Sequence, residues 1–362
     1  MKQKGRGLLA ALLAGTLAFL AGCGGSAYGQ EDLNSGKEAG ETIEIPEDRE
    51  QEADYTSPEG LTAGKGTYIA MVLKNLDDPY WKAVREGAEK AVEDLNSRLG
   101  YTGDDKIQLT VDGVQGTGEE FVDDQINIID TVLAENPSAL CLAVIDRESC
   151  AAQIEAAGES EIPVIVLDSG SENGDADAVC MTDNEKAAGE AAERLCEKIG
   201  GKGQIAVFAH EESSQTSRER TDGFCRAVLD QYPQVEIVKV AYEEEGELPV
   251  QETLERYPDI RGIFCTSAGT VERVLEETGD AAGSEIQIVG FDANQKEITA
   301  VREGKLLGTV CQNPRGMGYV SVTAAIRRLN GQPVDARIDT GYVWLDQNNL
   351  ENEENQKYLY DL

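Results

Sequence analysis

Acidic and aromatic side chains follow several apolar, strand-like segments of this sequence. They are Asp78, Tyr80, Trp81, Asp168 and Asp292. Carboxylates accept protons from hydroxyl groups, and flat aromatic rings suit the apolar C–H faces of a sugar ring. Arg220 adds a guanidinium that can donate two hydrogen bonds to adjacent hydroxyls or to a carboxylate. Together these residue types suit a small, hydroxyl-rich ligand.

Each of these residues also has a purely structural explanation. Asp78 stands before Pro79, so helix capping alone explains this pair. Asp168, Asp292 and the Asp183-Asn184 pair can cap helices in the same way. Trp81 lies on a buried helical stripe, and Arg220 can occupy a solvated helix face. However, the aspartates that follow strands all stand at the carboxyl ends of those strands, and open α/β sheets bind their ligands at this edge.

Motifs for catalysis and for metal binding are missing from the sequence. Its single histidine, His210, ends the strand-like segment 205–209, and we interpret it as a solvated loop residue. The His-Glu-x-x-His, Gly-x-Ser-x-Gly and phosphate-loop patterns are absent, as is Cys-x-x-Cys spacing. We therefore expect binding rather than catalysis, with no metal and no cofactor. A glycosidase with paired carboxylates stays open, because carboxylate separations cannot be read from sequence.

Short apolar strands alternate with amphipathic helices from residue 66 onward. The expected elements of the first half are strands at 68–73, 107–111, 139–145 and 164–167, and helices at 79–99, 121–133 and 150–157. The pattern restarts after Asp183 with helices at 185–199 and 217–231 and strands at 205–209, 235–240, 263–265 and 286–290. Near-continuous apolar strands between helices predict parallel sheets covered on both faces. We expect an α/β fold with two doubly wound lobes and a ligand cleft between them.

The N-terminal region has the layout of an export signal. Lys2, Lys4 and Arg6 precede the apolar segment 8–20, and small residues precede Cys23. The apolar segment is too short to cross a bilayer. Residues 23–64 are acidic, with no sustained apolar period, which predicts a flexible tether.

Length, net charge and cysteine content indicate the number of domains, the partners and the state of the thiols. The 362 residues suit about two domains. A net charge of −36 and the lack of a basic patch exclude nucleic acid as a partner. Seven cysteines remain besides Cys23, most of them among apolar neighbours, so we expect buried thiols rather than disulfides.

Three motifs, in this order and spacing, resemble those of type I periplasmic sugar-binding proteins, the ribose-binding group of ABC importers. Residues 76–81, Leu-Asp-Asp-Pro-Tyr-Trp, resemble the family's Leu-Asn-Asn-Pro-Phe-Phe. Residues 162–168, Ile-Pro-Val-Ile-Val-Leu-Asp, and 289–292, Val-Gly-Phe-Asp, match two further family motifs. The similarity covers about residues 66–345. Residues 20–23, Leu-Ala-Gly-Cys, resemble a lipoprotein box, which implies cleavage after residue 22 and diacylation of Cys23.

The resemblance implies a site and a hinge. Asp78, Tyr80 and Trp81 would line the first lobe, and Asp168 would bind the ligand's hydroxyls. The residues that would close from the second lobe and the hinge are Asn184, Arg220, Asp292 and Gln312. The chain would cross between lobes near residues 182, 312 and 338, which divides it into a first lobe of 65–182 plus 313–337 and a second of 183–312 plus 338–362.

The sequence departs from the family pattern at three places. Ser169 stands where the family often has arginine, and Ser267-Ala268 replaces an Asn-Asp pair. The stacking aromatic residue of the second lobe has only Tyr242 as a candidate.

We therefore expect an exported, monomeric solute-binding lipoprotein on the outer face of the cytoplasmic membrane. It would deliver a small polar ligand to an ABC permease, and we expect this ligand to be a monosaccharide. A ligand-presenting sensor for a membrane kinase and a secreted glycoside hydrolase are the alternatives. The effector domain of a transcriptional regulator shares this fold, but such a protein needs a DNA-reading motif, and here an export signal occupies the N-terminus.

Overall fold

The computed structural model describes residues 53–116, 121–146, 148–169, 176–244 and 247–360. The expected export signal 1–22, Cys23 and the tether as far as residue 52 lie outside the described residues. No helix in the described part of the chain is both long and apolar enough to cross a membrane.

The first lobe is built on a six-stranded parallel sheet with the strand order β11-β5-β4-β3-β1-β2. Its strands are β1 (Tyr68–Leu73), β2 (Gln108–Gly113), β3 (Ala139–Leu142), β4 (Val164–Leu167), β5 (Ala178–Met181) and β11 (Arg337–Asp339). Every residue of β3 and of β4 is buried. Helices cover both faces of the sheet, which explains why these central strands are continuously apolar.

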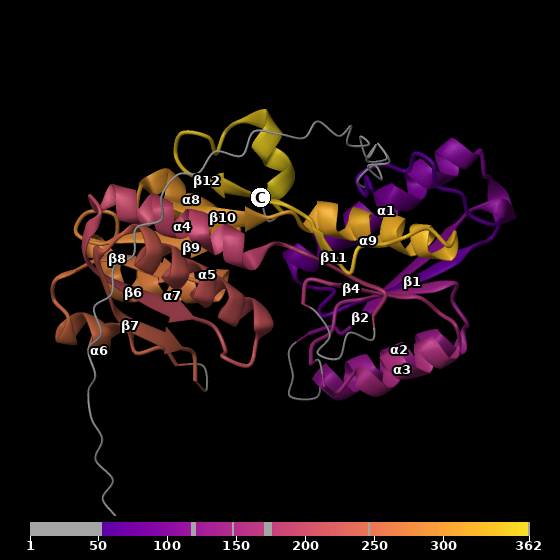
Figure 1. The fold of residues 1–362 in the computed structure, drawn as a ribbon, viewed down its shortest axis with the longest axis horizontal. Helices are drawn as coiled ribbons and strands as arrows, with labels where there is room; N and C mark the ends of the chain where they lie inside the picture. Colours follow the sequence, from indigo (N-terminus) through magenta and orange to yellow (C-terminus); the bar gives the residue numbers. More distant parts are fainter. Residues whose placement is uncertain (1–52, 117–120, 147, 170–175, 245–246, 361–362) are drawn as a thin grey trace, which may run out of the picture. The chain divides into compact units, whose positions relative to one another are not determined.

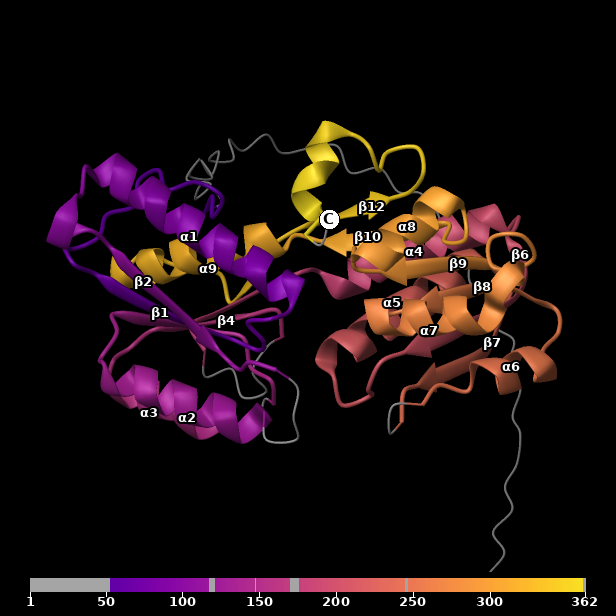
Figure 2. The same ribbon diagram turned by 180° about the vertical axis from the view of Figure 1, so that it is seen from behind.

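Two pairs of helices cover the first sheet on opposite faces (Figures 1 and 2). Helices α1 (Pro79–Leu99) and α9 (Pro314–Leu329) lie on one face, and α2 (Phe121–Ala134) and α3 (Ala151–Glu159) on the other. Helix α1 begins where its sequence predicts, since the Asp78 carboxylate accepts a 2.7 Å hydrogen bond from the Tyr80 amide.

Helices α1 and α9 pack against each other through glycine. A Cβ atom added at Gly318 would lie 1.9 Å from the Val84 carbonyl oxygen, and one added at Gly87 would lie 1.8 Å from the Arg315 carbonyl oxygen. Only glycine permits so close an approach of two helix backbones.

The second lobe repeats this plan with the strand order β12-β10-β9-β8-β6-β7. Its strands are β6 (Lys202–Ala209), β7 (Gln234–Tyr242), β8 (Ile260–Cys265), β9 (Gln287–Phe291), β10 (Gly308–Gln312) and β12 (Tyr342–Leu345). Its helices are α4 (Asn184–Lys198) and α5 (Gln215–Gln231) on one face, and α6 (Val250–Arg256), α7 (Ala268–Thr278) and α8 (Gln295–Glu303) on the other. Only the edge strand β12 runs antiparallel to its neighbour. The expectation of two parallel-sheet α/β lobes is confirmed.

The chain passes from one sheet to the other between β5 and α4, between β10 and α9, and between β11 and β12. The third passage falls at residues 340–341, slightly later than the expected 338, because residues 337–339 pair with β5 of the first sheet.

Residues 53–64, expected in the tether, pack against the first lobe instead. Tyr55 and Leu61 are buried in its core. The Thr323 hydroxyl donates a 2.6 Å hydrogen bond to the Tyr55 carbonyl oxygen. Composition alone missed this because the two apolar side chains stand singly among acidic and small residues.

The seven cysteines of the described chain are free thiols, and all except the half-buried Cys225 are buried. Burial raises the pKa of the Cys141 thiol to about 12 and that of Cys196 to about 11. These cysteines act as small apolar side chains, as their neighbours predict.

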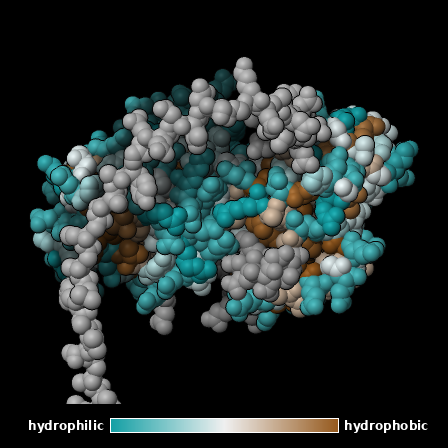
Figure 3. Space-filling model, viewed as in Figure 1, coloured by the Kyte–Doolittle hydropathy of each residue, from teal (hydrophilic) through white to brown (hydrophobic). Residues whose placement is uncertain are grey.

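The surface reflects the acidic composition. The face drawn in Figure 3 is mostly hydrophilic. Among the described residues, the large apolar side chains that are exposed are Leu229, Val240 and Leu329. They lie on three different elements, α5, β7 and α9.

Candidate ligand-binding site

A cavity of about 360 Å³ lies between the carboxyl ends of the two sheets and takes its lining from both lobes. Six of the eight residues proposed from sequence line it, namely Asp78, Tyr80, Asp168, Arg220, Asp292 and Gln312. The other two, Trp81 and Asn184, lie behind this lining. Polar groups that converge in a pre-formed cavity at strand ends are typical of a ligand site in α/β proteins.

Asp168 and Asp292 occupy equivalent positions in the two lobes. Asp168 directly follows β4 and Asp292 directly follows β9, which are each the fourth strand of their lobe in chain order. Both residues have a positive φ, 70° at Asp168 and 89° at Asp292. The Asp168 amide donates to the Cys180 carbonyl oxygen and the Asp292 amide to that of Val310. A positive φ strains a side-chain-bearing residue, and such strain concentrates at functional sites.

In the first lobe, two donors hold the Asp168 carboxylate. Lys74 Nζ lies 2.7 Å from Oδ2, and the Tyr80 hydroxyl donates a 3.2 Å hydrogen bond to Oδ1. Burial, followed by the charge of Asp168, raises the pKa of Tyr80 well above its ordinary value. Tyr80 therefore stays a neutral hydrogen-bond donor.

Trp81 belongs to the core of the first lobe rather than to the cavity wall. Its side chain is 7% exposed, and its ring meets that of Tyr80 edge to face at 5.0 Å between centroids. Lys74 Nζ lies 5.4 Å from the centroid of the indole ring. Trp81 thus positions Tyr80 and Lys74, in keeping with its place on the buried helical stripe.

In the second lobe, a network of buried partners orients Arg220. Its Nε donates to Asn184 Oδ1 at 2.9 Å, and its Nη1 donates to the Thr266 carbonyl oxygen at 2.9 Å. The guanidinium carbon lies 3.7 Å from the centroid of the Phe291 ring. Asn184 therefore acts on the cavity through Arg220.

Gln312 connects the Asp292 carboxylate to the passages between the lobes. Its Nε2 donates to Asp292 Oδ1 at 2.7 Å, and its Oε1 accepts a 3.2 Å hydrogen bond from the Thr182 hydroxyl. Thr182 and Gln312 stand at the first and second of these passages. The Gln312 side chain thus connects the cavity to both of these passages between the lobes.

The interpretation of His210 as a solvated loop residue is wrong. Its side chain lines the cavity, and its ring nitrogens lie 2.7 Å from the Thr266 hydroxyl and 3.3 Å from the Thr216 hydroxyl. Burial, followed by the charge of Arg220, lowers the pKa of His210 to about 3. One sequence signal could have placed His210 in the site. It directly follows the strand β6, as Lys74 directly follows β1.

The lowered pKa of His210 predicts a pH dependence of stability. Between pH 7 and pH 5 His210 becomes protonated in the unfolded chain but stays neutral in the folded protein. The free energy of unfolding therefore decreases as the pH falls through the pKa that His210 has in the unfolded chain. We expect the free energy of unfolding to drop by roughly 2 kcal/mol more in the wild type than in His210→Asn over this interval. Urea unfolding at both pH values measures the difference. Equal drops in the two proteins would contradict the burial of this ring.

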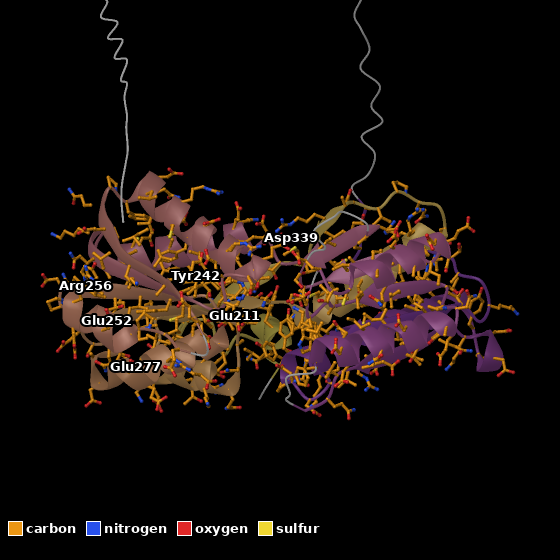
Figure 4. All side chains as sticks on the ribbon, turned by 90° about the horizontal axis from the view of Figure 1, so that it is seen from below. Glu211, Tyr242, Glu252, Arg256, Glu277 and Asp339 are labelled. Carbon is orange, nitrogen blue, oxygen red and sulfur yellow. The ribbon has the colours of Figure 1, made fainter. Side chains whose placement is uncertain are left out.

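Tyr242, the aromatic candidate for the second lobe, does not line the cavity. It borders a separate surface hollow of about 1180 Å³ together with Glu212, Glu244, Glu247 and Glu252. Figure 4 shows Tyr242 on the second lobe. Seven other residues that sequence did not propose for the site complete the cavity, namely Pro79, His210, Thr216, Ser267, Ala268, Asn294 and Tyr360.

No group of three or more potential metal ligands is found within the described part of the chain. The charged groups of the site instead have polar partners within the protein, and Gln312 donates to Asp292. Lys74 faces Asp168, and Arg220 lies beside buried hydrogen-bond acceptors. This arrangement suits an uncharged ligand that both donates and accepts hydrogen bonds.

The sequence profile of the periplasmic binding protein domain matches residues 69–333. The chain belongs to this family. A ribose import binding protein from Bacillus subtilis is 24% identical over 286 residues, which cover 78% of this chain and 88% of that protein. A D-apiose import binding protein from Actinobacillus succinogenes is 25% identical over 234 residues, or 62% of this chain and 70% of that protein.

Solved structures of this family have the same fold. A solute-binding protein of an ABC transporter from Agrobacterium vitis, with bound D-fucose, is 25% identical and superimposes with a TM-score of 0.67 over 81% of this chain and 100% of that chain. An arabinose-binding protein from Geobacillus stearothermophilus is also 25% identical, with a TM-score of 0.67 over 78% of this chain and 97% of that chain. The resemblance to type I periplasmic binding proteins is therefore confirmed.

Proposed function

We propose that this periplasmic binding protein captures a monosaccharide between its two lobes and delivers it, unchanged, to an ABC import permease. The observation that carries the proposal is the cavity at the facing sheet edges, where Asp168 and Tyr80 from one lobe meet Arg220 and Asp292 from the other. Relatives that import ribose and D-apiose support the sugar class.

The cavity chemistry accounts for affinity and for closure. A hydrogen bond to a charged group contributes about 1.5–3 kcal/mol, so a handful of such bonds supports micromolar binding after the costs of ordering. A ligand that touches both lobes stabilises the closed arrangement more than the open one. The permease would then recognise the closed form.

Residues 1–23 extend the proposal to the place of action. Export by the signal 1–22 and diacylation of Cys23 would hold the protein on the outer face of the cytoplasmic membrane, because two acyl chains anchor far more firmly than one. The net negative charge of the chain disfavours contact with an anionic membrane surface, which would leave the cavity accessible from outside.

A thermal-shift screen tests the proposed function. D-ribose, D-arabinose, D-allose, D-fucose and D-apiose are added separately to the purified chain. A sugar present at 100 times its Kd should stabilise the protein by about 2.7 kcal/mol and raise its melting temperature. Mass spectrometry should recover the same sugar intact. No shift with any sugar would refute the monosaccharide class, and an altered sugar would favour the glycosidase alternative.

A further inference from the structure

The C-terminal segment of the chain supplies an aromatic side chain to the cavity. Strand β12 ends at Leu345, and the chain then continues through the 3₁₀ helix Glu353–Tyr358 to Tyr360, which lines the cavity. The strand-end loops of the second lobe contribute polar residues such as His210, Ser267 and Asn294 to the same cavity. Tyr360 thus brings an aromatic ring to a wall that, apart from Ala268, is polar.

The segment that carries Tyr360 is firmly anchored. Leu350 and Leu359 are 1% and 3% exposed and belong to the core of the second lobe. Arg315 Nη1, from the first turn of α9, donates hydrogen bonds to the carbonyl oxygens of Leu359 and Lys357 at 2.8 and 3.2 Å. The backbone on either side of the 3₁₀ helix is therefore fixed before any ligand binds, which lowers the entropy cost of using Tyr360 in binding.

The Tyr360 ring has a defined orientation. Its hydroxyl oxygen accepts a 3.2 Å hydrogen bond from the Ala293 amide, directly after Asp292. Its ring meets that of Tyr80 edge to face, with 5.5 Å between centroids and an interplanar angle of 86°. Two aromatic rings at right angles thus form a corner of the cavity, one from α1 of the first lobe and one from the C-terminal segment.

This corner lies beside the carboxylates of the cavity. The charges of both Asp168 and Asp292 act on the Tyr80 hydroxyl, and the charge of Asp292 acts on Tyr360. A sugar bound to these carboxylates through its hydroxyls would present its C–H face to an adjacent ring. Packing of aromatic rings on apolar C–H surfaces is favourable in this geometry.

We propose that Tyr360 is a ligand-contacting residue, which packs its ring against the apolar face of the bound sugar. This rests on the proposed function of the cavity as a monosaccharide site. The C-terminal segment then serves as a third wall of the cavity beside the two lobes. It supplies the aromatic surface that Tyr242 was expected to provide.

A positioning role is the alternative for Tyr360. Its hydroxyl could serve only to hold the Ala293 amide, and thereby Asp292, in place. The two roles depend on different atoms, the ring in one case and the hydroxyl oxygen in the other. Tyr360→Phe keeps the ring and removes the hydroxyl, whereas Tyr360→Ala removes both.

Calorimetry on the full chain separates these roles. The probe is whichever of the five sugars of the thermal-shift screen binds the wild type most tightly. We expect Tyr360→Ala to weaken binding at least tenfold and Tyr360→Phe to stay within about threefold of the wild type. The control is Tyr358→Ala, two residues before Tyr360 at the end of the 3₁₀ helix, because Tyr358 packs against the second-lobe core and does not line the cavity. It should bind like the wild type.

The outcomes distinguish this proposal from the function on which it rests. Wild-type affinity in Tyr360→Ala would overturn the contact while leaving the sugar site intact. An equal loss in Tyr360→Phe and Tyr360→Ala would assign Tyr360 to positioning and also overturn the contact. Failure of the wild type to bind any of the five sugars would overturn the proposed function, and the contact with it.

Discussion

Arg220→Ala should weaken sugar binding by about two powers of ten. The substitution removes a charged donor from the cavity and leaves the Asn184 amide oxygen and the Thr266 carbonyl oxygen without their 2.9 Å partner. Loss of one charge-assisted hydrogen bond, together with the disorder of its neighbours, costs about 3 kcal/mol of binding free energy. Calorimetry with the sugar that gives the largest thermal shift measures the change.

Two further variants sharpen the test of Arg220. Arg226→Ala is the matched control, because Arg226 lies on the same helix, exposed and paired with Glu185 at 2.7 Å. It should bind like the wild type. Arg220→Lys keeps the charge but cannot make both fixed hydrogen bonds, so its affinity should fall between those of the wild type and the alanine variant. Unchanged affinity in Arg220→Ala would remove Arg220 from the site.

Gly318→Ala should destabilise the protein by about 3 kcal/mol. The added Cβ would lie 1.9 Å from the Val84 carbonyl oxygen, a distance that real Cβ contacts do not reach, so α1 and α9 must move apart. Overpacking of a tightly packed interior costs about this much, and here the atom that must yield belongs to the backbone. Urea denaturation monitored by circular dichroism gives the free energy of unfolding.

Gly158→Ala is the control for this glycine. Gly158 lies in α3, and a Cβ added there would meet nothing within 4 Å. The substitution should stabilise the helix by about 0.5–1 kcal/mol, because alanine loses less conformational freedom than glycine on folding. A Gly318→Ala protein as stable as the wild type would mean that the two helices are farther apart than described here.

The fold was predictable because its signals are local. The helix expected at 79–99 and the strands expected at 68–73 and 164–167 have those bounds in the structure. A buried helical stripe, a proline at the first helical position and a glycine after the last one mark α1 in sequence alone. Covered parallel strands are likewise recognisable from four consecutive apolar residues.

The two carboxylates that the lobes contribute to the site were predictable because each directly follows a strand. The carboxylates at 168 and 292 stand directly after β4 and β9, and both line the cavity. Lys74 escaped notice, since its partner Asp168 is 94 residues away along the chain. Tyr360 escaped for the same reason, because it contacts the Ala293 amide across 67 residues. Contacts at such separations leave no periodic signal.

The unprotonated imidazole in the cavity has a consequence for where the protein can work. Habitats beyond the buffered cytosol, to which the proposed export would bring this chain, vary in acidity. Since the pKa of His210 is about 3, its ring carries the same charge in neutral and in mildly acidic surroundings. Under the proposed function, we therefore expect protonation of His210 to contribute no change in sugar affinity in mildly acidic surroundings, where a histidine of ordinary pKa would become charged.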